Sequence, residues 1–184
     1  MNMPKVASVI ACQIGQLAKK ELEKLVLKAA SKDKSFHDYL LVNYFEKEHG
    51  ELDLFKQAKD ELELLFRKNY KGFSEELQMA AMLGACTKRI TEFSKICKNR
   101  NLEADLIMHV LEIPFSLSVN VFCTCFTAFN YKVVLLIKRI INLLQHKMHE
   151  DYLVQYRTKI NEYLNILHRT SDHLNYVNAL PQYI

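Results

Sequence analysis

Apolar residues recur every three or four positions along most of this chain, which is the period of an α-helix. The clearest stretch runs from Glu51 to Phe66, begins with acidic residues and ends in a basic run, as the helix dipole favours. Comparable apolar stripes predict longer helices over residues 74–96, 102–112 and 133–144 and from residue 150 onward. Shorter helices are predicted over residues 6–17, 22–27 and 36–44. The pattern therefore predicts an all-α protein of about seven helices.

Local signals place the ends of several of these helices. Ser74 precedes Glu75 and Glu76, the arrangement typical of a helix N-cap followed by an acidic first turn. Asn101 and Asn130 are predicted to cap the two helices that follow. Gly50 and Gly72 are interpreted as breaks between elements.

One segment departs from the helical period. Ile113–Tyr131 holds nineteen residues without a charge, and its first half alternates apolar and polar residues as a strand does. A lone strand leaves its backbone groups without partners, and no second strand is predicted. We therefore expect a buried helix kinked near Pro114, followed by a tucked loop at about residues 120–127, and the balance of helix and loop stays open. Its serines, threonines and asparagines make a membrane span improbable.

Composition agrees with short connections between helices. The chain has 184 residues, 49% of them hydrophobic, with only four glycines and three prolines. Turns and sheets need these two residues, so their scarcity favours helices. No linker divides the sequence, which predicts a single domain over residues 1–184. Antiparallel helical hairpins packed as a bundle or as a short helical array both fit.

The cysteines indicate a reducing compartment. There are five, an odd number, and no pair has the CxxC spacing of a zinc or redox motif. We expect reduced thiols in a cytoplasmic protein, mostly buried, with Cys123 and Cys125 inert. No cofactor motif is present, since the chain lacks a phosphate loop, a dinucleotide fingerprint, a GxSxG elbow and an HExxH pair.

A polar stripe is the first candidate site. Asp105, His109 and Glu112 share one face of the helix predicted over residues 102–112. Carboxylates and an imidazole in this arrangement suit proton transfer or a metal. Glu112 borders the uncharged segment, so we expect it to be partly buried. A salt-linked structural stripe is the preferred alternative.

Two histidines form a weaker candidate. His146 and His149 are three residues apart and precede two acidic residues, so neutral imidazoles could share a metal. Zinc sites normally need three or four protein ligands, and no further ligand is identifiable. A solvated helix junction is the preferred interpretation.

Basic residues gather in two stretches and suggest an anion-binding or nucleic-acid-binding face. The formal net charge is only +4, which permits an acidic partner without requiring one. Two ordinary solvated faces are therefore preferred to a phosphate-binding surface. The residues of this candidate face are Lys88, Arg89, Lys95, Lys98, Arg100, Lys138 and Arg139.

Four runs resemble a small family of uncharacterised bacterial helical proteins. They are KELEKLVLKAASKDK at residues 20–34, NLEADLIMHVLEIPFSLS from Asn101, FNYKVVLLIKR from Phe129 and INEYLNILHRTSDHLNYV from Ile160. The resemblance implies a bacterial, cytosolic, all-helical protein. It implies no activity and no site residue.

These observations favour a helical interaction or scaffold module that acts by binding a protein, either another chain or a second copy of itself. A large exposed apolar surface would support this hypothesis. The alternatives are nucleic-acid or anion binding through the basic face, and a metal-dependent or acid/base enzyme at His109 and Glu112. The lack of catalytic motifs favours a protein that is not an enzyme, and a membrane partner is not expected.

Overall fold

The computed structural model describes residues 6–125, 127–146, 148 and 150–184, and within these residues every regular element is a helix. The prediction of an all-α fold is confirmed. The chain forms two compact units, Met1–Gly50 and Glu51–Ile184, which we call the N-terminal unit and the helical core unit. That residues 1–184 act as a single domain stays a prediction.

The N-terminal unit consists of short helices. Asp33 separates two of them, and its side chain accepts from the backbone N–H groups of Ser35 and Phe36, which makes it the N-cap of the second. The boundary between the units falls inside the fourth helix, so Gly50 is helical and does not break the chain as predicted. The elements are α1 (Ser8–Gly15), α2 (Lys19–Lys32), α3 (Lys34–Leu40), the π-helical turn η1 (Leu41–Phe45) and the start of α4 (Lys47–Phe66).

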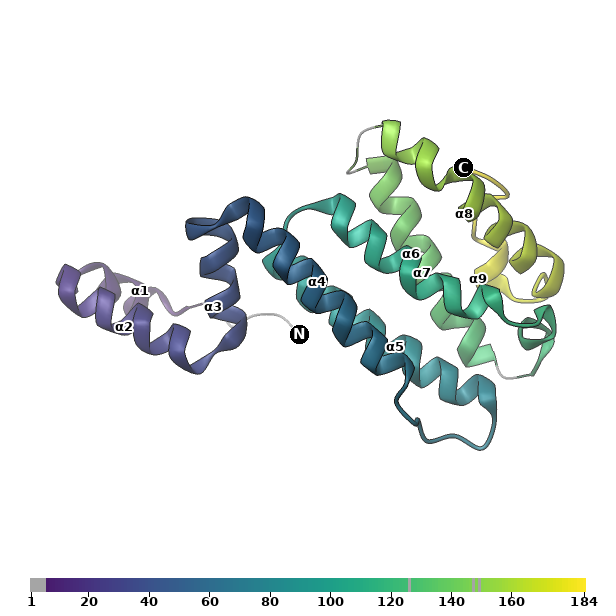
Figure 1. Cartoon of the computed structure of the whole chain (residues 1–184), viewed down its shortest axis with the longest axis horizontal. Helices are drawn as coiled ribbons and strands as arrows, with labels where there is room; N and C mark the ends of the chain where they lie inside the picture. Colours follow the sequence, from purple (N-terminus) through teal and green to yellow (C-terminus); the bar gives the residue numbers. More distant parts are fainter. Residues whose placement is uncertain (1–5, 126, 147, 149) are drawn as a thin grey trace. The chain divides into compact units, whose positions relative to one another are not determined.

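The helical core unit holds the long helices that the sequence predicts (Figure 1). Three of them, α5, α6 and α7, pack on one another, and α8 packs on α7 and on η2. Long helices that follow one another along the chain run antiparallel and are joined by short connections (Figure 1). After α4 the elements are α5 (Glu75–Ile96), α6 (Arg100–Ser116), the 3₁₀ turn η2 (Val119–Cys123), α7 (Thr127–His146), α8 (Glu150–Thr170) and α9 (Asn175–Asn178).

The core of this unit is built from the inner faces of α4, α5, α6, α7 and α8. Their apolar side chains are wholly excluded from solvent because the helical period places them on one side. Burial of such side chains is the main source of stability for a helical fold. The fully buried residues include Leu83, Cys86, Ile90 and Phe93 of α5, Leu106, Ile107 and Leu111 of α6, Val133, Leu136, Ile137 and Ile140 of α7, and Ile160, Leu164 and Leu167 of α8.

The helix ends correct two of the predicted caps. Ser74 accepts from the backbone N–H of Leu77 and is the N-cap of α5, as expected. The cap of α6 is Asn99, whose side chain accepts from the N–H of Asn101 at 3.2 Å, so the predicted cap at Asn101 is wrong by two residues. Asn130 lies inside α7, where it is buried instead of capping the helix.

The uncharged segment at residues 113–131 is helix and short turns, as expected. Helix α6 continues two residues past Pro114, and η2 occupies much of the predicted loop. Phe122 is buried between the rings of Phe115 and Phe129, with centroids 5.1 and 5.2 Å away. Only part of the segment is core, because Val119, at 48% exposure, and several polar neighbours face solvent.

Candidate functional site

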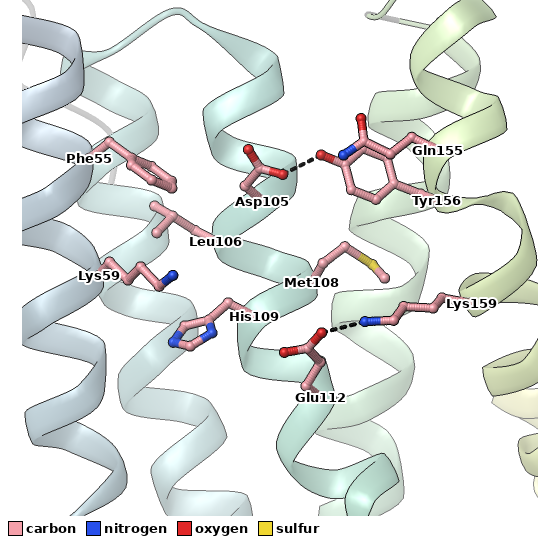
Figure 2. Close-up of a pocket in the computed structure, with 10 residues that line it drawn as sticks. All are labelled: Phe55, Lys59, Asp105, Leu106, Met108, His109, Glu112, Gln155, Tyr156 and Lys159. Atoms are coloured by element: carbon pink, nitrogen blue, oxygen red, sulfur yellow. Dashed lines mark hydrogen bonds and ion pairs between the residues drawn. The ribbon is translucent and has the colours of Figure 1, made fainter.

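The predicted polar stripe lies along a groove in the helical core unit. Asp105, His109 and Glu112 all line a cavity of about 410 Å³ whose floor is α6 and whose walls are α4 and α8 (Figure 2). Residues at i, i+4 and i+7 share one helix face. The opposite face of α6, with Ile107 and Leu111, faces the core. The lining residues are Phe55, Lys59, Asp105, Leu106, Met108, His109, Glu112, Gln155, Tyr156 and Lys159.

Asp105 joins α6 to α8. The Tyr156 hydroxyl donates a hydrogen bond to its carboxylate, across 51 residues of sequence. Tyr156 is itself buried, at 7% exposure, so the bond satisfies a hydroxyl that would otherwise lack water. Tyr156 was not predicted to line a site, because it belongs to the apolar stripe of α8.

His109 joins α6 to α4. Its Nε2 lies 2.8 Å from a carboxylate oxygen of Glu63, and its ring lies 5.4 Å from the ring of Phe66. A carboxylate on one ring nitrogen fixes the orientation of an imidazole. Glu63 was not predicted as a partner, because nothing local marks a contact between residues 46 positions apart.

Glu112 pairs with Lys159 of α8, whose ammonium donates to its carboxylate. The hydrogen bond to Glu112 is the main cause that raises the pKa of Lys159 above its ordinary value. The side chain of Glu112 is half-buried, at 50% exposure, and it lines the groove from the last part of α6.

Lys59 brings an unpaired charge to the groove. Its ammonium extends from α4 toward α6, between Leu106 and His109 in the view of Figure 2. In the part of the chain that the structure describes, no carboxylate forms an ion pair with Lys59. Lys59 was not among the predicted site residues, because nothing local in the sequence indicates that it faces the candidate stripe.

The metal hypothesis for the two histidines remains untested. His146 is the exposed last residue of α7, and His149 lies outside the described residues. Within residues 6–125, 127–146, 148 and 150–184 no group of three or more His, Cys, Asp or Glu side chains is placed to hold a metal ion.

The predicted basic face is divided between internal pairs and solvent. Three of its members are held by carboxylates: Arg89 by Glu61, and both Arg100 and Arg139 by Glu103. Paired guanidinium groups are less available to a phosphate backbone than free ones. The remaining members, Lys88, Lys95, Lys98 and Lys138, are exposed. Binding of nucleic acid through this face stays a prediction.

The cysteines divide in a way the sequence did not predict. Cys86 and Cys97 are buried, and burial raises their pKa values to about 12 and about 11. Cys12, Cys123 and Cys125 are exposed, so the expectation that Cys123 and Cys125 are buried is wrong. They lie in and just after η2, which is a surface turn.

The N-terminal unit carries a second candidate site, an exposed apolar surface. Of the seventeen large apolar side chains exposed in the described part of the chain, nine belong to this unit. Among its described residues only Val42 and Gly50 are buried. We use the name N-terminal apolar surface for Val6, Val9, Ile10, Ile14, Leu25, Val26, Leu27, Tyr44 and Phe45, which are 41 to 74% exposed.

The spacing of these residues places most of them on helix faces. In α1, Ile10 and Ile14 are four residues apart on one face and Val9 lies beside them, and Val6 precedes the helix. In α2, Leu25 and Val26 continue a stripe that begins at Leu22. None of the described helices is long and apolar enough to cross a membrane.

Comparisons with known proteins identify no family. No protein-family model matches the chain, and no curated protein or solved structure matches it. The all-helical part of the resemblance found in the sequence is confirmed by the structure. The likeness to a bacterial family stays a prediction.

Proposed function

We propose that this protein acts by binding another protein through the N-terminal apolar surface. The observation that carries the proposal is the contrast between the two units. Among the described residues the N-terminal unit exposes nine large apolar side chains and buries only Val42 and Gly50, whereas the much longer helical core unit exposes eight and buries a large core. Exposed apolar residues that gather in one region commonly mark a binding surface for a protein.

Energetics supports the same conclusion. Isolated helices shorter than about 12 to 15 residues are marginal in water, and ordering each residue costs about 1 to 2 kcal/mol of chain entropy. Helices α1 and α3 have eight and seven residues, and α1, α2 and α3 contain no buried residue. A partner that covers the N-terminal apolar surface would supply the missing hydrophobic stabilisation.

The form of the surface favours a helical partner. Amphipathic helices bind one another through anchors spaced three or four residues apart, as Ile10 and Ile14 of α1 and Leu22 and Leu25 of α2 are. Free thiols at exposed positions agree with a reducing compartment, and with the resemblance of the sequence they support the cytoplasm of a bacterium as the place of action.

Affinity capture with the full-length chain tests this function. The variant Val9→Glu combined with Ile10→Glu puts two charges on the surface. Gln13→Glu combined with Gln16→Glu adds the same charges at exposed polar positions nearby and serves as the matched control. We expect a protein that the wild type and the control retain and the Val9/Ile10 variant loses, with light scattering to show whether that protein is a second copy.

Two outcomes contradict the proposal. One is a set of captured proteins that is the same for all three chains. The other is cosedimentation of the wild type with vesicles of anionic lipid, lost in the Val9/Ile10 variant, without any protein partner. Vesicle cosedimentation is included as a separate experiment because Lys20, Lys24 and Lys28 form a basic row along α2 that could bind anionic lipid.

A further inference from the structure

The groove between α4 and α8 has the size of a small-molecule site. Its volume of about 410 Å³ lies within the range of roughly 300 to 1,000 Å³ that is typical of ligand pockets. Phe55 gives the groove apolar contact surface from the α4 wall, whereas Met108, at 5% exposure, and Leu106, which is fully buried, form the packed layer beneath it (Figure 2). This groove belongs wholly to the helical core unit and is independent of the N-terminal apolar surface.

The α4 side of the groove offers a cation. Lys59 extends its ammonium into the groove and forms no ion pair in the described chain. His109 lies on the same side, with Nε2 held by Glu63, which leaves Nδ1 as its second polar atom. A cation without an ion-pair partner at the rim of a cleft can bind a carboxylate.

The α8 side of the groove offers a hydrogen-bond acceptor, because within the described chain only one of the two carboxylate oxygens of Glu112 is hydrogen-bonded. Lys159 donates to one oxygen of Glu112, and Figure 2 shows the second oxygen turned away from Lys159, toward the α4 side. A carboxylate has room for about four hydrogen bonds, so this oxygen can accept from an ammonium. In the described residues no hydrogen bond to it is formed.

We propose that the groove binds a small zwitterion with an apolar body, of the kind represented by an α-amino acid with a large apolar side chain. Its carboxylate would pair with Lys59, its ammonium with the free oxygen of Glu112, and its side chain would lie against Phe55 and the exposed edge of Met108.

Charge balance selects this class of ligand over simpler ions. The groove presents two ammonium groups, on Lys59 and Lys159, and two carboxylates, on Asp105 and Glu112. A simple anion would gain Lys59 but would be repelled by the carboxylates of the same groove, and a simple cation would gain Glu112 but would be repelled by the two ammonium groups. A molecule that carries both charges on one carbon satisfies both groups and leaves the balance unchanged.

Ligand titration of the full-length protein tests the proposal. The methyl NMR signal of Met108 reports on the groove, and the probes are L-phenylalanine, L-leucine and L-methionine, each with its decarboxylated amine and its deaminated acid. We expect at least one amino acid to shift this signal in a saturable way, at concentrations at least tenfold below those its amine and acid require. The proposal would be overturned if the amine or the acid bound as tightly as the amino acid. It would also be overturned if no amino acid shifted the signal at concentrations up to about 10 mM, which is the weak end of specific binding.

Two variants assign the contacts. Lys59→Gln removes the proposed partner of the ligand carboxylate, and Lys56→Gln makes the same change at an exposed position of α4 outside the groove. We expect Lys59→Gln to weaken the amino acid about tenfold and to leave its amine unweakened, whereas Lys56→Gln changes neither. Glu112→Gln keeps an oxygen for Lys159 and should weaken the amino acid while sparing its acid. Equal effects of Lys59→Gln and Lys56→Gln would contradict the assignment.

Discussion

Arg139 of α7 and Glu103 of α6 form an ion pair in the interior of the helical core unit. The Glu103 side chain is only 4% exposed, and one of its oxygens lies 2.7 and 3.0 Å from two guanidinium nitrogens of Arg139. Arg100 pairs with its second oxygen, and Thr91 and Ser94 of α5 accept from the rest of the Arg139 guanidinium. The carboxylate is thus the point at which α5, α6 and α7 are joined by polar contacts.

Removal of this carboxylate is expected to destabilise the protein strongly. Glu103→Ala leaves two guanidinium groups without a counter-charge near the core, and breaking a buried pair in this way costs about 3 kcal/mol or more. Urea unfolding, followed by circular dichroism, measures the change in free energy. Glu103→Gln retains a hydrogen-bond acceptor and should cost less.

Glu162 provides the matched control for that prediction. It is an exposed glutamate of α8, so Glu162→Ala should change the free energy of unfolding by no more than about 0.5 kcal/mol. Similar values for the Glu103→Ala and Glu162→Ala proteins would show that the Glu103 pairs contribute little to stability.

A second polar cluster holds η2 against α7 and α8. The Asn130 amide donates to the carbonyl of Phe122 at 2.9 Å and to the Ser171 hydroxyl at 3.1 Å, and all three groups are buried. Asn130→Ala should therefore lower the free energy of unfolding by about 2 to 3 kcal/mol, through the lost donor and the small cavity. Ser171→Ala should cost about 1 kcal/mol.

A double-mutant cycle distinguishes this cluster from two independent contacts. The costs of Asn130→Ala and Ser171→Ala should fail to add by at least about 0.5 kcal/mol, because each residue bonds the other and both bond the carbonyl of Phe122. Strict additivity in urea unfolding would show that the two side chains act separately.

These two clusters mark the limit of what the sequence predicts. Helical periodicity and the cap at Ser74 were enough to place the long helices, since both signals are local. Arg139 was assigned to a basic surface, and Asn130 to a helix cap, because residue type alone does not show which side of a helix faces a neighbour. Their partners lie 36 and 41 residues away, and only the packing of α6, α7 and α8 brings them together.

In the candidate groove, too, the sequence predicted what one helix contributes and missed what other helices contribute. One helix supplies Asp105, His109 and Glu112, so their common face was predictable from their spacing. Lys59 and Lys159 come from two other helices and were not predicted. The burial of the uncharged segment was overestimated for a related reason: a lack of charge does not require burial, and Cys123 and Cys125 lie in a surface turn.

Thiol reactivity should follow the observed division of the cysteines. Iodoacetamide at about pH 8 should alkylate Cys12, Cys123 and Cys125 in the native protein, because they are exposed. Cys86 and Cys97 should react only after denaturation, since burial blocks access and raises their pKa values. Peptide mass spectrometry counts the sites, and native alkylation of Cys86 at the rate of Cys123 would contradict the packing of α5.

Alkaline pH should weaken the fold through the same two buried thiols. Burial raises the pKa of Cys86 to about 12 and that of Cys97 to about 11 in the folded protein, while an unfolded thiol ionises at about 8.5. Between these values the unfolded chain binds fewer protons than the folded one, so stability falls as pH rises. This stabilisation is complete below about pH 8. Above pH 8, each thiol lowers the free energy of unfolding by up to about 1.4 kcal/mol per pH unit.

Urea unfolding of wild type, Cys86→Ala and the surface control Cys123→Ala at a series of pH values between 8 and 10.5 measures this slope. Because alanine cannot ionise, Cys86→Ala should reduce the slope and Cys123→Ala should not, and equal slopes for all three proteins would show that ionisation of Cys86 is not linked to unfolding.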